Sequence, residues 1–160
     1  MNLALIFAGG TGTRMNSKTK PKQFLELNGK PIIIHTIELF ESHPEIDAIA
    51  VVCLESWIGY LNELLERFRI KKVKYVVPGG ETGQQSIRNG LTAFWDDQDI
   101  PRDSLVLIHD GVRPLINEDI ITRSIECAKQ YGNAITVTPA IETIITVSEA
   151  DSVDQIMDRS

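Results

Sequence analysis

The chain has 160 residues, 42% hydrophobic side chains and a net charge of −6, which suits one domain and argues against a general nucleic-acid-binding protein. Its two cysteines, Cys53 and Cys127, are too few for a disulfide scaffold and lack metal-ligand spacing, so we expect reduced core thiols. The apolar run at residues 3–8 has neither the length of a membrane span nor the charged start of a secretion signal. We therefore expect a cytoplasmic protein without a membrane partner.

The first 40 residues are predicted to contain a buried strand, a long loop and the start of a helix. Residues 2–8 are apolar and end at two glycines, as expected for a strand buried on both faces. Residues 8–22 lack apolar periodicity, so we expect a long loop, which in a compact domain is commonly functional. A turn at residues 26–29 precedes Pro31, which suits the first position of a helix. The apolar face of that helix is expected to contain Ile33, Ile34, Ile37 and Phe40.

Strands and helices alternate along the rest of the chain. The sequence predicts strands at residues 48–53, 73–77, 105–108 and 134–137, helices at residues 57–68, 86–95 and 118–131, and a further β-rich stretch at residues 143–147. This alternation is typical of an α/β fold with a doubly wound, mostly parallel, Rossmann-like sheet. Ligands of such sheets bind beyond the carboxyl ends of the strands.

Basic residues are concentrated at the start of the chain. Residues 1–25 carry a charge of +4, and the remainder carries −10. This positive region suits a compact polyanion such as a nucleoside triphosphate better than a long duplex. Arg14 offers a planar fork of donors to two phosphate oxygens, and Lys22 a compact charge to a third. For Lys18 and Lys20 we expect solvated side chains that only add to the local field.

Two glycine-rich turns follow predicted strands. The first, residues 8–15, lets backbone N–H groups approach an anion. It lacks the third glycine of a dinucleotide fingerprint and the later acidic residue, and it is not a Walker loop; a purely structural turn is the alternative. The second, residues 78–83, is closed by Ser86 at a predicted helix start. It can read a flat base through backbone groups, or it simply joins a strand to a helix.

A carboxylate follows the apolar strand at residues 105–108. Asp110 is placed where this strand meets the ligand crevice, and Mg²⁺ prefers one or two carboxylates together with phosphate oxygens. The alternative is an aspartate that caps the next turn. Arg113 adds a second cation, which either binds substrate or pairs with Asp110. We expect His109 to pack or to orient Asp110 rather than act as a base.

Four motifs together resemble a known family. Residues 8–15, 21–24, 79–86 and 109–114 look like the corresponding segments of the cytidylyltransferases that make CDP-methylerythritol or CDP-ribitol. The resemblance covers nearly the whole chain and implies the nucleotide-diphospho-sugar transferase variant of the Rossmann-like fold. It further implies an enzyme that transfers CMP from CTP to a polyol phosphate, uses Mg²⁺ and forms a homodimer through an arm that begins near Thr143.

The resemblance also assigns roles to individual residues. Catalysis is expected of Arg14 and Lys22, and Mg²⁺ binding of Asp110. Nucleotide binding is expected of Ala8, Gly9, Gly10, Thr11, Gly12, Gly80 and Ser86. The acceptor phosphate is expected to face Arg113, Thr143 and Arg159.

Several positions depart from the family pattern. Gly83 stands where the family often has an arginine, and Glu142 and Ile145 replace its usual aspartate and lysine. Family chains continue past the position of Ser160, so we interpret residues 1–160 as one nucleotidyltransferase domain without its final segment. The turn at residues 111–112 resembles that of the polyol-phosphate members more than the alanine-rich turn common in methylerythritol enzymes, and this resemblance favours a pentitol phosphate such as ribitol 5-phosphate over methylerythritol phosphate. A nicotinamide-dependent oxidoreductase and a non-catalytic nucleotide-binding module are the alternative functions.

Overall fold

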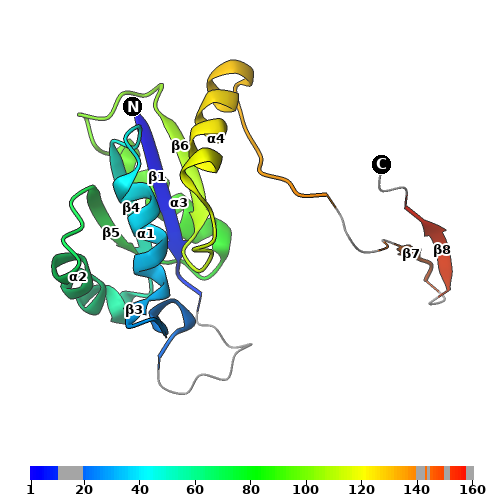
Figure 1. Cartoon of the computed structure of the whole chain (residues 1–160), viewed down its shortest axis with the longest axis horizontal. Helices are drawn as coiled ribbons and strands as arrows, with labels where there is room; N and C mark the ends of the chain where they lie inside the picture. Colours follow the sequence, from blue (N-terminus) through cyan, green and yellow to red (C-terminus); the bar gives the residue numbers. More distant parts are fainter. Residues whose placement is uncertain (11–19, 140–142, 144, 150–151, 158–160) are drawn as a thin grey trace.

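The computed structural model describes residues 1–10, 20–139, 143, 145–149 and 152–157. Its centre is a parallel sheet in the order β5-β4-β1-β6 (Figure 1). The strands are β1 (Asn2–Ala8), β4 (Ala48–Cys53), β5 (Val73–Pro78) and β6 (Leu105–Asp110). Strand β1 is paired with β4 on one side and β6 on the other, and its interior is buried, as its apolar sequence predicts. The predicted doubly wound α/β fold is confirmed.

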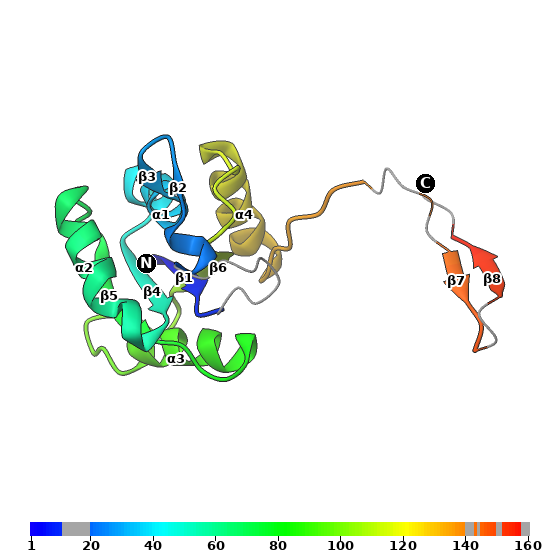
Figure 2. The same ribbon diagram turned by 90° about the horizontal axis from the view of Figure 1, so that it is seen from below.

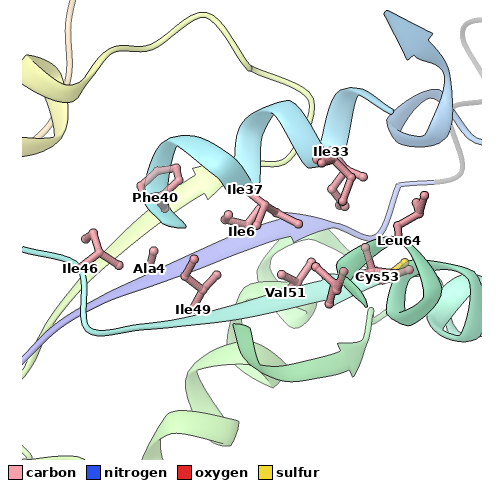
Figure 3. Packing of buried hydrophobic residues seen from close by; sticks show 14 of the residues in the cluster. Ala4, Ile6, Ile33, Ile37, Phe40, Ile46, Ile49, Val51, Cys53 and Leu64 are labelled. Carbon is pink, nitrogen blue, oxygen red and sulfur yellow. The ribbon is translucent and has the colours of Figure 1, made fainter. Parts of the chain in front are cut away.

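Helices cover both faces of this sheet (Figure 2). One face packs against α1 (Ile32–Ser42), α2 (Ile58–Arg67) and α4 (Glu118–Tyr131), and the other packs against α3 (Gly83–Trp95). Figure 3 shows the first interface, where Ile33, Ile37 and Phe40 of α1 meet Ala4 and Ile6 of β1. The alternation of side chains along β1 therefore divides its residues between two cores.

The start of α1 differs slightly from the prediction. The predicted turn at residues 26–29 is the tip of a hairpin formed by β2 (Glu26–Leu27) and β3 (Lys30–Pro31). Asn28 and Gly29 have φ angles of 53° and 75°, as a tight hairpin turn requires. Pro31 precedes the helix instead of occupying its first position, because it pairs with Glu26 across the hairpin. The predicted apolar face of the helix is confirmed.

Helix α3 begins three residues before its predicted start. Thr82 accepts a hydrogen bond from the backbone N–H of Gln85 at 3.1 Å and so caps the helix. The side chain of Gln85 in turn accepts from the N–H of Glu81 at 3.1 Å. Ser86 therefore lies in the first turn of α3 rather than at its start.

The strand predicted at residues 134–137 is wrong. This segment follows Gly132, which ends α4 with a φ of 87°, and it pairs with no described strand. Ile135 and Val137 are each 83% exposed, so their apolar side chains are not buried by this part of the chain. A strand needs a neighbour for its backbone hydrogen bonds, and β propensity alone does not provide one.

Beyond this segment lies a two-stranded antiparallel hairpin. Strand β7 (Ile145–Val147) confirms the predicted β-rich stretch, and it pairs with β8 (Val153–Ile156). The hairpin stands apart from the α/β body in both views (Figures 1 and 2). In the described parts of the chain, no helix has the length and apolar character needed to span a membrane.

Candidate functional site

Three loops meet at the carboxyl ends of the central strands, and glycines let them approach closely. A Cβ atom on Gly79 would lie 3.2 Å from the Cα of Gly9 and 3.3 Å from the Oγ of Ser86. A Cβ on Gly111 would lie 2.9 Å from the Cβ of Ala8. The turns after β1, β5 and β6 are thus in contact because these positions lack side chains. We call the end of the sheet that is formed by the carboxyl ends of its strands the site edge. It is the place where α/β proteins bind ligands.

Lys22 is carried by a rigid turn beside the end of β1. It begins the 3-10 helix Lys22–Phe24, whose Phe24 is fully buried. The ring of Phe24 stacks on Trp57 with centroids 4.9 Å apart and meets Tyr60 edge-on at 5.4 Å. Lys22 as a whole residue is half-buried, and its ammonium forms no hydrogen bond or ion pair with the described residues. Its charge is therefore available to an anion.

Gln23 joins this turn to β1. Its side chain is 0% exposed, and its Nε2 donates to the carbonyl oxygen of Ala8 at 2.7 Å. A longer contact of 3.4 Å reaches the carbonyl of Gly10. Lys22 and the turn after β1 are consequently held on the same edge of the sheet.

Asp110 ends β6 on that same edge, paired in register with Phe7 of β1. Its Oδ1 accepts from the N–H of Val112 at 3.1 Å, so the aspartate does cap the following turn. Its Oδ2 accepts from Nε of Arg113 at 3.3 Å, and the Arg113 side chain is 76% exposed. Such an exposed pair contributes little to stability, so a ligand can displace the arginine. The structure places Asp110 and Lys22 on one edge.

Two neighbours hold the loop after Asp110. His109 packs on Phe40 with ring centroids 5.3 Å apart, and its Nε2 hydrogen-bonds the carbonyl oxygen of Arg113 at 2.9 Å. The predicted packing role of this histidine is confirmed. Thr36 of α1 is fully buried and donates to the carbonyl oxygen of Gly111 at 3.0 Å. The sequence gives no sign of this contact, because Thr36 is separated from Gly111 by 75 positions.

The second glycine-rich turn is organised by Ser86. Its Oγ accepts from the N–H of Gly80 at 3.0 Å and donates to the carbonyl oxygen of Thr82 at 3.0 Å. Ser86 is 4% exposed, so its buried hydroxyl holds the turn in place through these two hydrogen bonds. The N–H of Gly79 donates to the carbonyl of Cys53 at 2.7 Å and fixes the turn to β4. Gly79 and Gly80 thus leave the backbone at the start of this turn without side chains of its own, while Gln85 packs against Gly80.

The cysteines differ in environment. Cys53 is buried at the end of β4, and this burial raises the pKa of its thiol to about 11. A thiol that stays protonated at neutral pH is a poor nucleophile, although Cys53 lies close to the site. Cys127 is only half-buried, so the expectation that both cysteines belong to the core is wrong for this one. It lies on α4, away from the core face of that helix.

The structure brings together most of the described residues that the sequence predicted. Those gathered at the strand ends are Ala8, Gly9, Gly10, Lys22, Gly80, Ser86, Asp110 and Arg113. The predictions for Thr11, Gly12, Arg14 and Arg159 fall outside the described residues, as does that for Lys18. Lys20 is half-buried with its ammonium 5.4 Å from the centroid of the Tyr60 ring, so it is not simply solvated.

Thr143 is not brought to the predicted site. It is exposed and lies two residues before β7, and the hairpin formed by β7 and β8 stands apart from the α/β body (Figure 2). Arg113 belongs to the loop after β6, so the two predicted acceptor contacts are separate within one chain. Two surface cavities of about 330 and 500 Å³ also lie away from Lys22 and Asp110.

The carboxylate of Asp110 is suited to a metal ion that is also bound by a ligand, and less suited to a metal ion bound by protein side chains alone. No group of three or more His, Cys, Asp or Glu side chains among the described residues has metal-binding geometry. Asp110 supplies one carboxylate whose Oδ2 has only an exposed arginine as its partner. Mg²⁺ is commonly bound by one carboxylate together with substrate phosphates and water, so Asp110 fits that chemistry.

The parallel sheet and its strand-end turns define an α/β protein of the nucleotidyltransferase fold. The chain belongs to the 2-C-methyl-D-erythritol 4-phosphate cytidylyltransferase family, IspD, whose profile matches residues 2–160. The family predicted from the four motifs is thereby confirmed. Two solved members of this group superpose on the chain. One is the 4-diphosphocytidyl-2C-methyl-D-erythritol synthase of Anaerococcus prevotii, with a TM-score of 0.75 and 27% sequence identity. The superposition covers 98% of this chain and 63% of the synthase. A second 4-diphosphocytidyl-2C-methyl-D-erythritol synthase has a TM-score of 0.77 and 25% identity, and its superposition covers 99% of this chain and 68% of the synthase.

Curated relatives carry two different names. The chain is 59% identical over 160 residues to the ribitol-5-phosphate cytidylyltransferase of Vibrio parahaemolyticus and 52% identical to that of Streptococcus agalactiae. It is 40% identical over 161 residues to the 2-C-methyl-D-erythritol 4-phosphate cytidylyltransferase of Clostridium acetobutylicum. All of this chain is aligned in each case, and it spans 66%, 66% and 67% of the relatives' lengths.

Proposed function

We propose that the protein transfers CMP from CTP to a polyol phosphate of the ribitol 5-phosphate type and releases pyrophosphate. One observation carries the proposal: the ammonium of Lys22, which has no partner among the described residues, and the carboxylate of Asp110 lie on one sheet edge, beside turns that glycines bring into contact. The higher identity to relatives named for ribitol 5-phosphate supports this acceptor over methylerythritol phosphate. Membership of the cytidylyltransferase family favours this chemistry over a nicotinamide-dependent oxidation.

The reaction would be an in-line displacement at the α-phosphorus of CTP. An oxygen of the acceptor phosphate forms the new P–O bond, and the bond to the bridging oxygen of pyrophosphate breaks. The attacking phosphate is already ionised, so the step needs no general base. The protein's task is to hold two anions that repel each other and to neutralise the charge that develops between them. We propose that Lys22 does this for the triphosphate, together with Arg14.

Asp110 would hold a Mg²⁺ ion through its Oδ2 after Arg113 moves away. When bound, the ion would neutralise phosphate charge and orient the triphosphate. Arg113, once released, would be free to pair with the acceptor phosphate, since a guanidinium matches phosphate geometry. The Asp110–Arg113 pair would thus be exchanged for two contacts with substrates.

The hairpin supports a proposal about assembly. Ile145, Val147, Val153 and Ile156 are between 44% and 66% exposed, an unusual share of apolar side chains for so short a hairpin. We propose that the hairpin packs against a second subunit and that the cytoplasmic enzyme is a homodimer. In that arrangement Thr143 would approach the acceptor site of the partner subunit. Light scattering after size-exclusion chromatography measures the mass; a monomer at micromolar concentration would contradict the dimer.

A pyrophosphate-release assay tests the proposed reaction. The protein is given CTP and Mg²⁺ with ribitol 5-phosphate, methylerythritol phosphate or related polyol phosphates in separate reactions. We expect turnover with ribitol 5-phosphate and a lower kcat/KM with methylerythritol phosphate. Binding of CTP without pyrophosphate release from any acceptor would show a binding module instead.

Replacing Lys22 provides the matched test of its role. Lys22→Ala should lower kcat by about 100-fold, equivalent to roughly 3 kcal/mol, the scale seen when one preorganised electrostatic contact is lost. Lys129→Ala is the control, because Lys129 pairs with Glu45 at 3.2 Å on the surface and is not on the site edge. If both variants lose the same share of kcat, or if neither variant loses any, Lys22 has no specific role in the mechanism.

A further inference from the structure

We propose that Gln23 is a positioning residue that fixes Lys22 against the glycine turn after β1; this inference rests on the cytidylyltransferase function proposed above. Gln23 follows Lys22 directly in the chain and is 0% exposed. It contacts no substrate in this scheme, because its amide is directed at the backbone. Its effect on catalysis would be transmitted through Lys22.

The hydrogen bonds of the amide connect two elements that are distant in sequence. Nε2 donates to Ala8, the last residue of β1, across 15 positions at 2.7 Å, and it also lies 3.4 Å from the carbonyl oxygen of Gly10. Ala8 belongs to a strand paired on both sides, so it is a rigid reference point. Both oxygens belong to the backbone of the turn that is expected to hold the triphosphate. The side chain therefore sets the separation between that turn and the backbone of Lys22.

A lysine needs this kind of support more than an arginine does. Its ammonium is carried on a flexible four-carbon chain, so its placement depends on how well its backbone is fixed. Phe24 holds the C-terminal end of the 3-10 turn against Trp57 and Tyr60, and Gln23 holds the middle. A displacement of about 1 Å at a catalytic group can cost about 100-fold in rate. Loss of the Gln23 contacts is expected to produce a displacement of this kind.

The amide's hydrogen bonds are all on its nitrogen side. Oε1 of Gln23 has no hydrogen-bond partner, and among the described residues no other buried side-chain nitrogen or oxygen shares this condition. The link to the turn after β1 therefore depends on the Nε2 donor alone. Methionine has nearly the same shape but no donor, so Gln23→Met removes this link while the packing changes little.

A double-mutant cycle tests whether Gln23 acts through Lys22. We expect Gln23→Met to lower kcat for pyrophosphate release by at least about 10-fold and to raise KM for CTP by less than Lys22→Ala does. In a Lys22→Ala background the same substitution should change kcat by less than about 3-fold, because the group it positions is gone. A merely structural role would produce the same loss of kcat in both backgrounds, and that result would overturn the inference.

Two further variants keep the test decisive. Gln23→Leu removes both polar atoms of the amide, so it should reproduce the effect of Gln23→Met if the methionine variant does not fold. Thr122→Val removes a 3.0 Å hydrogen bond to the buried His43, beyond the far end of α1, and should lower thermal stability without changing kcat. If the wild-type protein releases no pyrophosphate, the proposed function fails and this inference fails with it. If the wild type is active and both Gln23 variants match it, only the inference fails.

Discussion

Replacing Gly79 by alanine would test whether the two glycine-rich turns must touch. The added Cβ would lie 3.2 Å from the Cα of Gly9 and 3.3 Å from the Oγ of Ser86, closer than ordinary contact distance. One neighbour is backbone, and the other is a buried hydroxyl with two hydrogen bonds, so neither can move freely. Forcing a methyl group into such a contact costs about 1–3 kcal/mol. We expect the turns to separate and KM for CTP to rise at least about 10-fold.

Gly83→Ala is the matched control for this substitution. No heavy atom lies within 4 Å of a Cβ built on Gly83, and neither glycine has a positive φ. Both alanines reduce the freedom of the unfolded chain by a similar amount, worth about 0.4–1 kcal/mol, and this effect cancels between the two variants. Thermal unfolding should therefore place the Tm of Gly79→Ala about 3–10 °C below that of Gly83→Ala. Equal Tm and equal KM in the two variants would refute the contact between the turns.

Three other predictions concern the core, the cysteines and pH. Ile37→Ala should lower the free energy of unfolding by about 2–5 kcal/mol, measured by urea denaturation, because Ile37 is 0% exposed; a change below about 1 kcal/mol would contradict the packing. Maleimide should label Cys127 in the native protein and spare Cys53, as judged by mass spectrometry; rapid labelling of Cys53 would show that its burial is wrong. Hydrogen bonds from the side chains of Lys74 and Tyr75 lower the pKa of Asp97 to about 2. A depressed pKa stabilises the fold above about pH 4, so the Tm advantage over Asp97→Asn should shrink between about pH 4 and pH 2; an advantage that grows there would contradict the assignment.

The sequence predicts the fold well where apolar runs are bounded by strong signals. The run that ends at Gly9 and Gly10 gives the limits of β1 correctly, because both of its faces are buried and its end is marked. Periodicity predicts the start of α3 three residues too late, because the Thr82 cap acts through a side-chain hydrogen bond that periodicity does not reveal. Residues 134–137 have strand composition but no described partner, and pairing depends on which strands are adjacent in space.

The candidate site was only partly predictable for a related reason. Lys22 and Asp110 could be found because each stands in a recognisable loop after an apolar strand. Gln23 and Thr36 could not, since each acts by hydrogen-bonding a carbonyl oxygen of a distant segment. A buried polar side chain that orients the backbone has no sequence pattern of its own, and only the packing of α1 and the 3-10 turn against the strand ends reveals it.

Whether Lys22 and Asp110 share one bound nucleotide is tested most directly by the affinity for CTP as a function of Mg²⁺ concentration. This affinity is determined by calorimetry for the wild type, Lys22→Ala and Asp110→Asn. A nucleotide shared by both residues predicts that Lys22→Ala weakens binding at every Mg²⁺ concentration. Asp110→Asn should instead remove most of the gain in affinity that Mg²⁺ gives to the wild type. If both variants bind CTP as the wild type does, with the same dependence on Mg²⁺, this edge of the sheet is not the nucleotide site.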